Sequence, residues 1–167
     1  MSMRAATAAI LCAFALLFAP SASAEPRGTI LSFGRYATQI SGKPEKAERT
    51  ASGVVQPVDG HRLLERADLI VGQLGNTFGF EVKLDGFPAG VAALTIRTAH
   101  PPLTNPKTGK VTAVSEYDWT SATNDSTYFC FSFDEKWEIA EGNWTIQVLH
   151  EGKVIAEKTF KIIVPLN

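Results

Sequence analysis

The stretch that decides the fold is Thr127–Val164, TYFCFSFDEKWEIAEGNWTIQVLHEGKVIAEKTFKIIV. It holds three runs of strand-forming residues, which are separated by Glu141-Gly142 and by Glu151-Gly152. Every second residue in each run is large and apolar: Phe129, Phe131 and Phe133, then Trp144, Ile146 and Val148, then Phe160, Ile162 and Val164. Because successive side chains of a strand point to opposite faces, each run offers one apolar face to a core. The stretch predicts the closing part of an antiparallel β-sandwich.

Two upstream segments repeat this period of two. Phe78–Leu84 alternates most cleanly, with apolar side chains on one face and polar or small ones on the other. Gly28–Thr38 predicts the first strand, in which Leu31, Phe33 and Tyr36 are the large side chains. The alternation of this first strand is imperfect, which indicates an edge position or a β-bulge.

The strands between these segments complete the pattern. Ala92–Thr98 predicts one strand, and Val111–Trp119 with Ser126–Phe133 predicts a hairpin around residues 122–125. Seven or eight short strands, with turn residues about every eight to twelve positions, are typical of an immunoglobulin-like antiparallel β-sandwich. The fold class is therefore all-β.

Four connecting segments lack a clear period. Ser41–Gly53 is polar and predicts a solvated loop. His61–Val71 can be read as a short helix or as extended chain, and we favour a strand for its second half. His100–Lys110 contains prolines that a strand interior does not tolerate, so a long loop is expected. Asp134–Glu141 predicts a crossover between the sheets.

The N-terminus has the organisation of a secretory signal peptide. Met1–Arg4 is a short positive start, Ala5–Ala19 is apolar, and Ala22-Ser23-Ala24 has the small residues that signal peptidase accepts. The apolar run is shorter than the roughly 20 residues needed to cross a bilayer, which argues against a membrane anchor. We expect cleavage after Ala24, a single domain over residues 25–167, no membrane span in the mature chain, and a periplasmic or secreted protein.

The cysteines agree with export to a bacterial periplasm. Cys12 leaves with the signal peptide, and Cys130 remains alone, so no internal disulfide is possible. Cys130 lies in the middle of a predicted strand, where a cysteine is usually a small buried apolar residue.

Several short motifs together resemble a known family. They are Gly34-Arg35-Tyr36, Leu74-Gly75 followed by Phe78-Gly79-Phe80, Phe133-Asp134 followed by Trp137-Glu138, Gly142-Asn143-Trp144-Thr145, and Phe160 with an apolar residue two positions on. This combination resembles the bacterial "domain of unknown function 3859" family over nearly the whole mature chain. The resemblance implies an exported all-β domain, and it supplies no activity, ligand or catalytic residue.

The sequence offers no catalytic, metal-binding or cofactor-binding constellation. The formal net charge is −1, which gives no electrostatic footprint for nucleic acid. His61, His100 and His150 are far apart and have no carboxylate or cysteine at metal-ligand spacing. Glu116 and Asp118 share a strand face, an arrangement that any strand with two acids on its wet side produces. We predict that the protein is not an enzyme and has no cofactor.

Three aromatic residues are the candidate ligand-binding residues. Tyr117 and Trp119 share one face of a strand, and Trp137 lies in the predicted crossover. Each tryptophan can either form an exposed stacking surface or close an end of the sandwich. The first hypothesis is a non-enzymatic binding or accessory module that contacts a protein partner through loops or a sheet edge, the first strand being the expected edge. The alternative is recognition of a carbohydrate or small ligand by these aromatic side chains.

Overall fold

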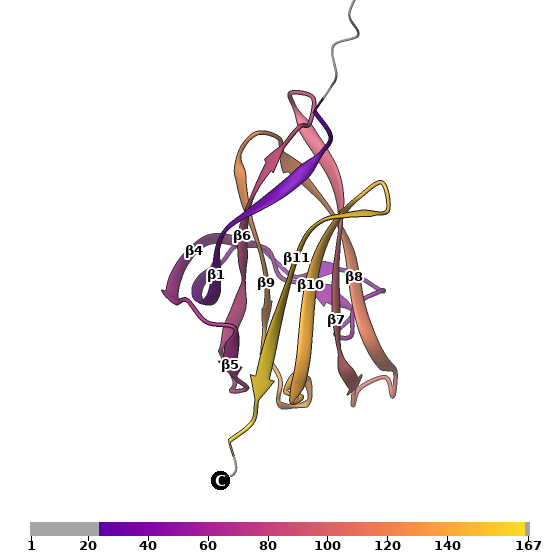
Figure 1. The fold of residues 1–167 in the computed structure, drawn as a ribbon. Coiled ribbons are helices and arrows are strands. Elements are labelled where there is room, and N and C mark those ends of the chain that lie inside the picture. The colour runs from indigo at the N-terminus through magenta and orange to yellow at the C-terminus, as the bar shows by residue number, and fades with distance from the viewer. Residues whose placement is uncertain (1–23, 166–167) are drawn as a thin grey trace, which may run out of the picture.

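The computed structural model describes residues 24–165, and almost all of the predicted signal peptide lies outside them. Two sheets pack face to face (Figure 1). The first has the strand order β4 (Val58–Glu65), β1 (Arg27–Ile40), β6 (Thr77–Asp85) and β9 (Ser126–Ser132). The second has the order β5 (Leu69–Val71), β11 (Lys153–Ile163), β10 (Gly142–His150), β7 (Val91–Thr104) and β8 (Val111–Ala122).

Two short strands and one helical turn complete the described chain. The strands β2 (Glu45–Lys46) and β3 (Val54–Val55) form a separate ladder, and η1 (Lys136–Glu138) is a 3₁₀ turn in the predicted crossover. All strand pairs are antiparallel except β5 with β11, which is parallel. The predicted fold class is confirmed, and the two principal sheets hold four and five strands, slightly more than the seven or eight expected.

The predicted alternation forms the core. Phe78, Phe80, Val82 and Leu84 of β6 are fully buried, and they face Trp144, Ile146 and Val148 of β10 and Phe160 and Ile162 of β11. The Trp144 indole N–H donates a hydrogen bond to the Ala140 carbonyl at 3.0 Å. A buried tryptophan needs such a partner, because an unmet donor in an apolar interior costs free energy.

The ends of the pattern depart from the prediction at two residues. Val164 is 39% exposed, because β11 ends at Ile163 before it. Leu31 is 46% exposed, because the pairing of β1 with β6 shifts register between Ile30 and Ser32. The imperfect alternation of the first strand thus reflects a bulge.

The expected edge position of the first strand is right for its first half and wrong for its second half. Arg27–Gly34 pairs with β6 alone, whereas Arg35–Ile40 pairs with β4, which forms the outer strand there, as β9 does on the opposite side of the sheet. The reason is that His61–Val71 contains no helix in the structure. Its first half belongs to β4, which covers β1, and Leu69–Val71 forms β5 as expected.

The predicted hairpin between Val111–Trp119 and Ser126–Phe133 is also wrong. β8 pairs with β7, whereas β9 pairs with β6 in the other sheet. The turn after Ala122 therefore carries the chain from one sheet to the other. Period and turn residues identify strands, but they do not identify the partner of each strand.

The predicted loop at His100–Lys110 begins later than expected. β7 continues through His100, Pro101 and Pro102 to Thr104. Its register with β8 is interrupted between Ala99 and Leu103, so the two prolines lie where the ladder does not require their missing N–H groups.

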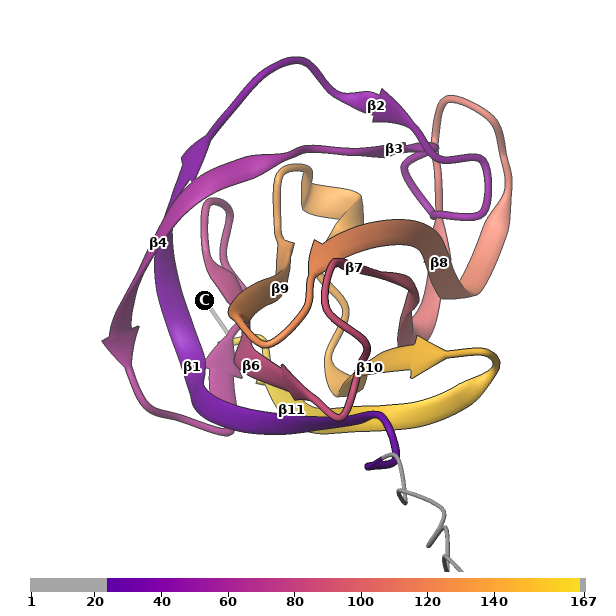
Figure 2. The same ribbon diagram turned by 90° about the horizontal axis from the view of Figure 1, so that it is seen from above.

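The segment between β1 and β4 is largely exposed, as its composition predicts, except at its tip. Residues 41–57, named here the arm, form a long extension of the β1–β4 hairpin, closed at its base by the bond from the Ser41 N–H to the Pro57 carbonyl at 2.9 Å. Figure 2 shows the arm arching from β1 and β4 across to β8. Thr50 and Ala51 near its tip are buried, each with 6% exposure.

Gly79→Ala tests the close approach of β6 to β9. A Cβ atom at Gly79 would lie 2.1 Å from the Phe129 carbonyl oxygen and 2.7 Å from the Cys130 Cα, both of which are backbone atoms. We expect the substitution to lower the free energy of unfolding by more than about 2 kcal/mol. The measurement is urea denaturation.

Gly60→Ala in β4 is the matched control. A Cβ atom there has its nearest contact at 3.5 Å, on the flexible Gln39 side chain. Its unfolding free energy should stay within about 1 kcal/mol of the parent. Equal losses for the two variants would contradict the assignment of strain to the β6–β9 contact.

Candidate functional site

The arm is attached to β8 and to the β7–β8 turn by four hydrogen bonds, one of which runs from the Lys110 ammonium to the Glu48 carbonyl at 3.0 Å. The Ala51 N–H donates to Ser115 Oγ at 3.0 Å, and the Asn105 side-chain amide donates to the Ala51 carbonyl at 3.0 Å. The Glu116 N–H donates to the Arg49 carbonyl at 3.1 Å. The arm thereby covers part of the free edge of β8, and the space between the two becomes a groove with a defined wall on each side.

A buried histidine supports this attachment. His100 Nδ1 lies 2.8 Å from the Pro101 carbonyl, which can only accept, so this nitrogen carries the proton. Nε2 then accepts from the Ser115 hydroxyl at 3.0 Å, and the same hydroxyl accepts from Ala51. Burial lowers the pKa of His100, which favours the neutral ring that this arrangement needs.

The contact of Ser115 with His100 has the atoms of a serine nucleophile and its base. His100 and Ser115 are both buried, with 6% and 7% exposure. A substrate therefore has no access to the Ser115 hydroxyl. The pair instead holds the arm in place, because this hydroxyl accepts the Ala51 N–H.

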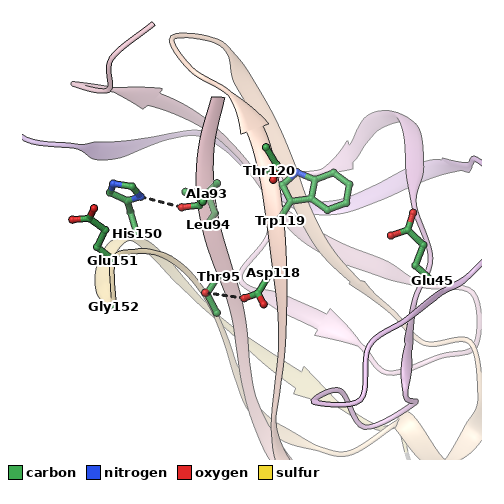
Figure 3. Close-up of a pocket in the computed structure, with 10 residues that line it drawn as sticks. All are labelled: Glu45, Ala93, Leu94, Thr95, Asp118, Trp119, Thr120, His150, Glu151 and Gly152. Carbon is green, nitrogen blue, oxygen red and sulfur yellow. Dashed lines mark hydrogen bonds between the residues drawn. The ribbon is translucent and has the colours of Figure 1, made fainter. Parts of the chain in front are cut away.

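The groove surrounds Trp119. One hollow of about 430 Å³ lies between the arm and β8, and Tyr117, Trp119 and Arg49 are among its lining residues. An adjoining hollow of about 700 Å³ extends from Trp119 over β7 to the turn between β10 and β11. Glu45, Asp118 and Trp119 line both, so we treat the two hollows as one site, the Trp119 groove. In Figure 3 the indole projects from β8 towards the side on which Glu45 lies.

An arginine occupies the space between the two acids that share a face of β8. Arg49 Nη1 lies 3.4 Å from Glu116 Oε2, and Arg49 Nη2 lies 2.8 Å from Asp118 Oδ1. Arg97 Nε contacts the other Glu116 oxygen at 2.5 Å. A pair of catalytic carboxylates needs room for a substrate between them, and here the Arg49 guanidinium fills that room.

The structure brings together two of the three predicted ligand-binding residues. Tyr117 and Trp119 are half-buried, line the groove and also pack against the core. Burial raises the pKa of the Tyr117 hydroxyl, which is therefore neutral.

Trp137 lies at a different place. It belongs to η1, which packs against β7. Shortly after η1 the chain reaches Gly142, which lies against Pro101 of β7. Trp119 is opposite Leu94 in the β7–β8 register. Leu94 and Pro101 are about 20 Å apart along a strand, so Trp137 is remote from the groove.

The outer face of the first sheet carries a second polar cluster, which the sequence analysis missed. The His61 ring stacks on Tyr128 with centroids 4.4 Å apart, and Tyr36 lies against both rings. His61 Nε2 is 3.9 Å from Glu81 Oε2. The neighbouring Cys130 is free, and burial raises the pKa of its thiol to about 12, so it is an unreactive thiol at neutral pH.

Two kinds of feature are absent from the described residues. Residues 24–165 contain no group of three or more His, Cys, Asp or Glu side chains placed to hold a metal ion. Over the same residues, no helix is long and apolar enough to cross a membrane.

A comparison with known protein families shows the family of this chain. Residues 26–162 match the family described as domain of unknown function (DUF3859). The chain belongs to this family. The resemblance recognised in the sequence motifs is therefore confirmed.

The solved structures support the fold. An immunoglobulin-like protein from Pseudomonas aeruginosa is 22% identical with a TM-score of 0.57, and the match covers 85% of this chain and 99% of that chain. At this identity the likeness shows the fold alone. No curated protein matches the chain.

Two larger proteins match more weakly. They are a Pseudomonas fluorescens alkylpurine DNA glycosylase bound to DNA (14% identity, TM-score 0.35, 57% of this chain and 27% of that chain) and a Trichoderma reesei β-D-glucoside glucohydrolase (15%, 0.34, 84% and 19%). Neither likeness carries an argument about this chain.

His100→Gln tests the link between the buried histidine and the arm. The pKa of His100 is lowered in the folded state, so the unfolded chain, with an ordinary value of about 6.5, binds more protons below that pH. The stability that neutral His100 contributes is therefore complete above about pH 6.5 and is lost as the pH falls towards the folded pKa.

We expect His100→Gln to lower the free energy of unfolding at pH 7.5 by about 1–2 kcal/mol. The glutamine amide does not reproduce the geometry of the two imidazole hydrogen bonds, to the Pro101 carbonyl and the Ser115 hydroxyl. The difference between the parent and the variant should shrink at pH 5.5. Chemical denaturation at both values measures it, and a difference that grows on acidification would contradict the assigned protonation.

Proposed function

We propose that this protein is an exported, non-enzymatic binding or accessory module that contacts a protein partner through the Trp119 groove. The observation that carries the proposal is the presence of Trp119, Tyr117 and Arg49 in one open groove formed by a loop and a strand edge. Tryptophan, tyrosine and arginine are the residues most enriched at the energetic centres of protein interfaces.

The organisation of the arm supports a role in binding. Residues 41–57 extend far beyond the β1–β4 hairpin, and only the tip contributes buried residues. A long loop of which only the tip packs against the body is a common position for recognition residues on a rigid sandwich.

The proposal includes export. Residues 1–24 have the charge, apolar run and small residues of a cleaved signal peptide, and residues 25–167 would then be the mature single domain in the periplasm or outside the cell. The single free cysteine, Cys130, is consistent with a domain that folds without disulfides in an oxidising compartment.

The arrangement of the polar residues supports a non-enzymatic role. The His100–Ser115 pair is buried, and Arg49 bridges Glu116 and Asp118. These are the groups that would otherwise act as nucleophile, base or paired acids, and each has a structural partner.

Trp119→Ala tests the proposal. Removing the indole from the centre of the groove should reduce affinity for the partner at least tenfold, since truncation of a central aromatic residue typically costs about 2 kcal/mol or more. The measurement is quantitative cross-linking in the native compartment with identification of the captured protein, followed by titration of that purified protein.

Leu69→Ser is the matched control, because Leu69 is also a large exposed side chain but lies on β5. It should leave capture unchanged. Trp119→Phe separates loss of contact from loss of folding, and thermal melting checks both groove variants. Unchanged partner affinity in a folded Trp119→Ala protein would contradict the proposal.

A second candidate function is recognition of a carbohydrate or small ligand by Tyr117 and Trp119. It is favoured by the hydrogen-bonding groups beside the indole, since Asp118, Thr95 and Thr120 also line the groove. An aromatic face flanked by carboxylate and hydroxyl groups is suited to a sugar ring. Because Trp137 is remote, it would not belong to this site.

Titration with neutral oligosaccharides tests this second function. Saturable binding that shifts the Trp119 indole N–H resonance, and that is lost in Trp119→Ala but kept in Trp137→Phe, is the expected result. Binding that depends equally on Trp137 would contradict the site.

A further inference from the structure

The Trp119 groove has an unequal distribution of charge. Five acidic side chains line its two hollows: Glu45, Glu48, Glu116, Asp118 and Glu151. Two basic side chains, Lys46 and Arg49, line it as well. The chain as a whole has a formal net charge of only −1, so this excess of acids is local.

Three of the five acids are already balanced. Lys46 Nζ lies 2.5 Å from Glu48 Oε1. Arg49 binds both Glu116 and Asp118, and Arg97 adds a second positive charge beside Glu116. In each pair the charges neutralise one another, and the two contacts of Arg49 also join the arm to β8.

The two remaining acids stand on opposite sides of the indole. Among residues 24–165, neither Glu45 nor Glu151 has an ion-pair partner. Figure 3 shows Glu45 on the arm, beyond the indole from β8, and Glu151 beside His150 on the other side of β7. Both residues are exposed, so both carboxylates are accessible to a partner.

The indole between them is half-buried and lines both hollows. The face of a tryptophan ring attracts a cation through its quadrupole, and arginine adds planar stacking to this attraction. A positively charged side chain on Trp119 would thus have negative groups on two sides.

We infer that the Trp119 groove binds an extended, basic segment of a partner protein, with an arginine or lysine side chain on the Trp119 face and further positive charges near Glu45 and Glu151. The inference rests on the proposed function, because it names the chemistry of the partner at the same groove. The two hollows lie on either side of Trp119, which suits a segment of several residues better than a single compact ligand.

A pair of short synthetic peptides tests the inference on the purified protein. One contains alternating arginine and glycine, and the other contains citrulline in place of arginine, which keeps the shape and removes the charge. Calorimetry and the Trp119 indole N–H resonance report binding. We expect the arginine peptide to bind at least about fivefold more tightly, and this advantage to decrease with rising salt, because exposed charges are screened.

Variants of the groove locate the effect. Glu45→Gln and Glu151→Gln should each weaken the arginine peptide by about twofold to fivefold and leave the citrulline peptide unchanged. Asp59→Asn removes the same charge from β4, where Asp59 is exposed and lines neither hollow, and it should change the affinity for neither peptide. Trp119→Phe should weaken the arginine peptide, because tryptophan is the stronger partner for a cation.

The outcomes separate this inference from the proposed function. Equal affinity for the two peptides, or an arginine preference that survives Glu45→Gln and Glu151→Gln together, overturns the basic partner. If partner capture still depends on Trp119 in that case, the protein-binding function stands and only the stated chemistry fails. If partner capture does not depend on Trp119, both fail. Tighter binding of a neutral oligosaccharide than of the arginine peptide also overturns the inference.

Discussion

Contact between the aromatic side chains of the two sheets is the constraint on which the structure depends. Trp144 of β10 is fully buried. The centroid of its ring lies 4.7–5.9 Å from those of Phe78 in β6, Phe131 in β9 and Phe133 directly after β9. Burial of several aromatic rings at one point supplies the largest apolar contribution that a domain of this size has. The two principal sheets, and with them the β7 and β8 side of the groove, are positioned by this interior.

The interior is connected to the groove through His100. Its ring lies 5.0 Å from that of Trp144, and its Nε2 meets the Ser115 hydroxyl, which accepts the Ala51 N–H of the arm. The arm is therefore held by a polar chain that begins against the central tryptophan. Since buried polar groups are costly unless they are paired, this chain favours one position of the arm.

The site combines one part that could be predicted with one that could not. Alternation along Val111–Trp119 placed Tyr117 and Trp119 on one face, and the structure has them together in the groove. Arg49 and Glu45 belong to a polar segment with no period, which carries no information about the strand that it will meet. The pairing of Arg49 with Glu116 and Asp118 joins residues more than sixty positions apart, and only the path of the arm brings them within reach.

The sequence by itself determined the all-β class, the family, most strands and the inward-facing residues, because the period of two is a local property of an extended chain. Only the tertiary structure decided which strands pair, that β4 covers the second half of β1, and that β8 and β9 belong to different sheets. It also decided that the prolines of β7 fall at a break in the ladder and that the arm closes against β8. These are non-local choices, set by which surfaces can be buried together, and short-range patterns do not contain them.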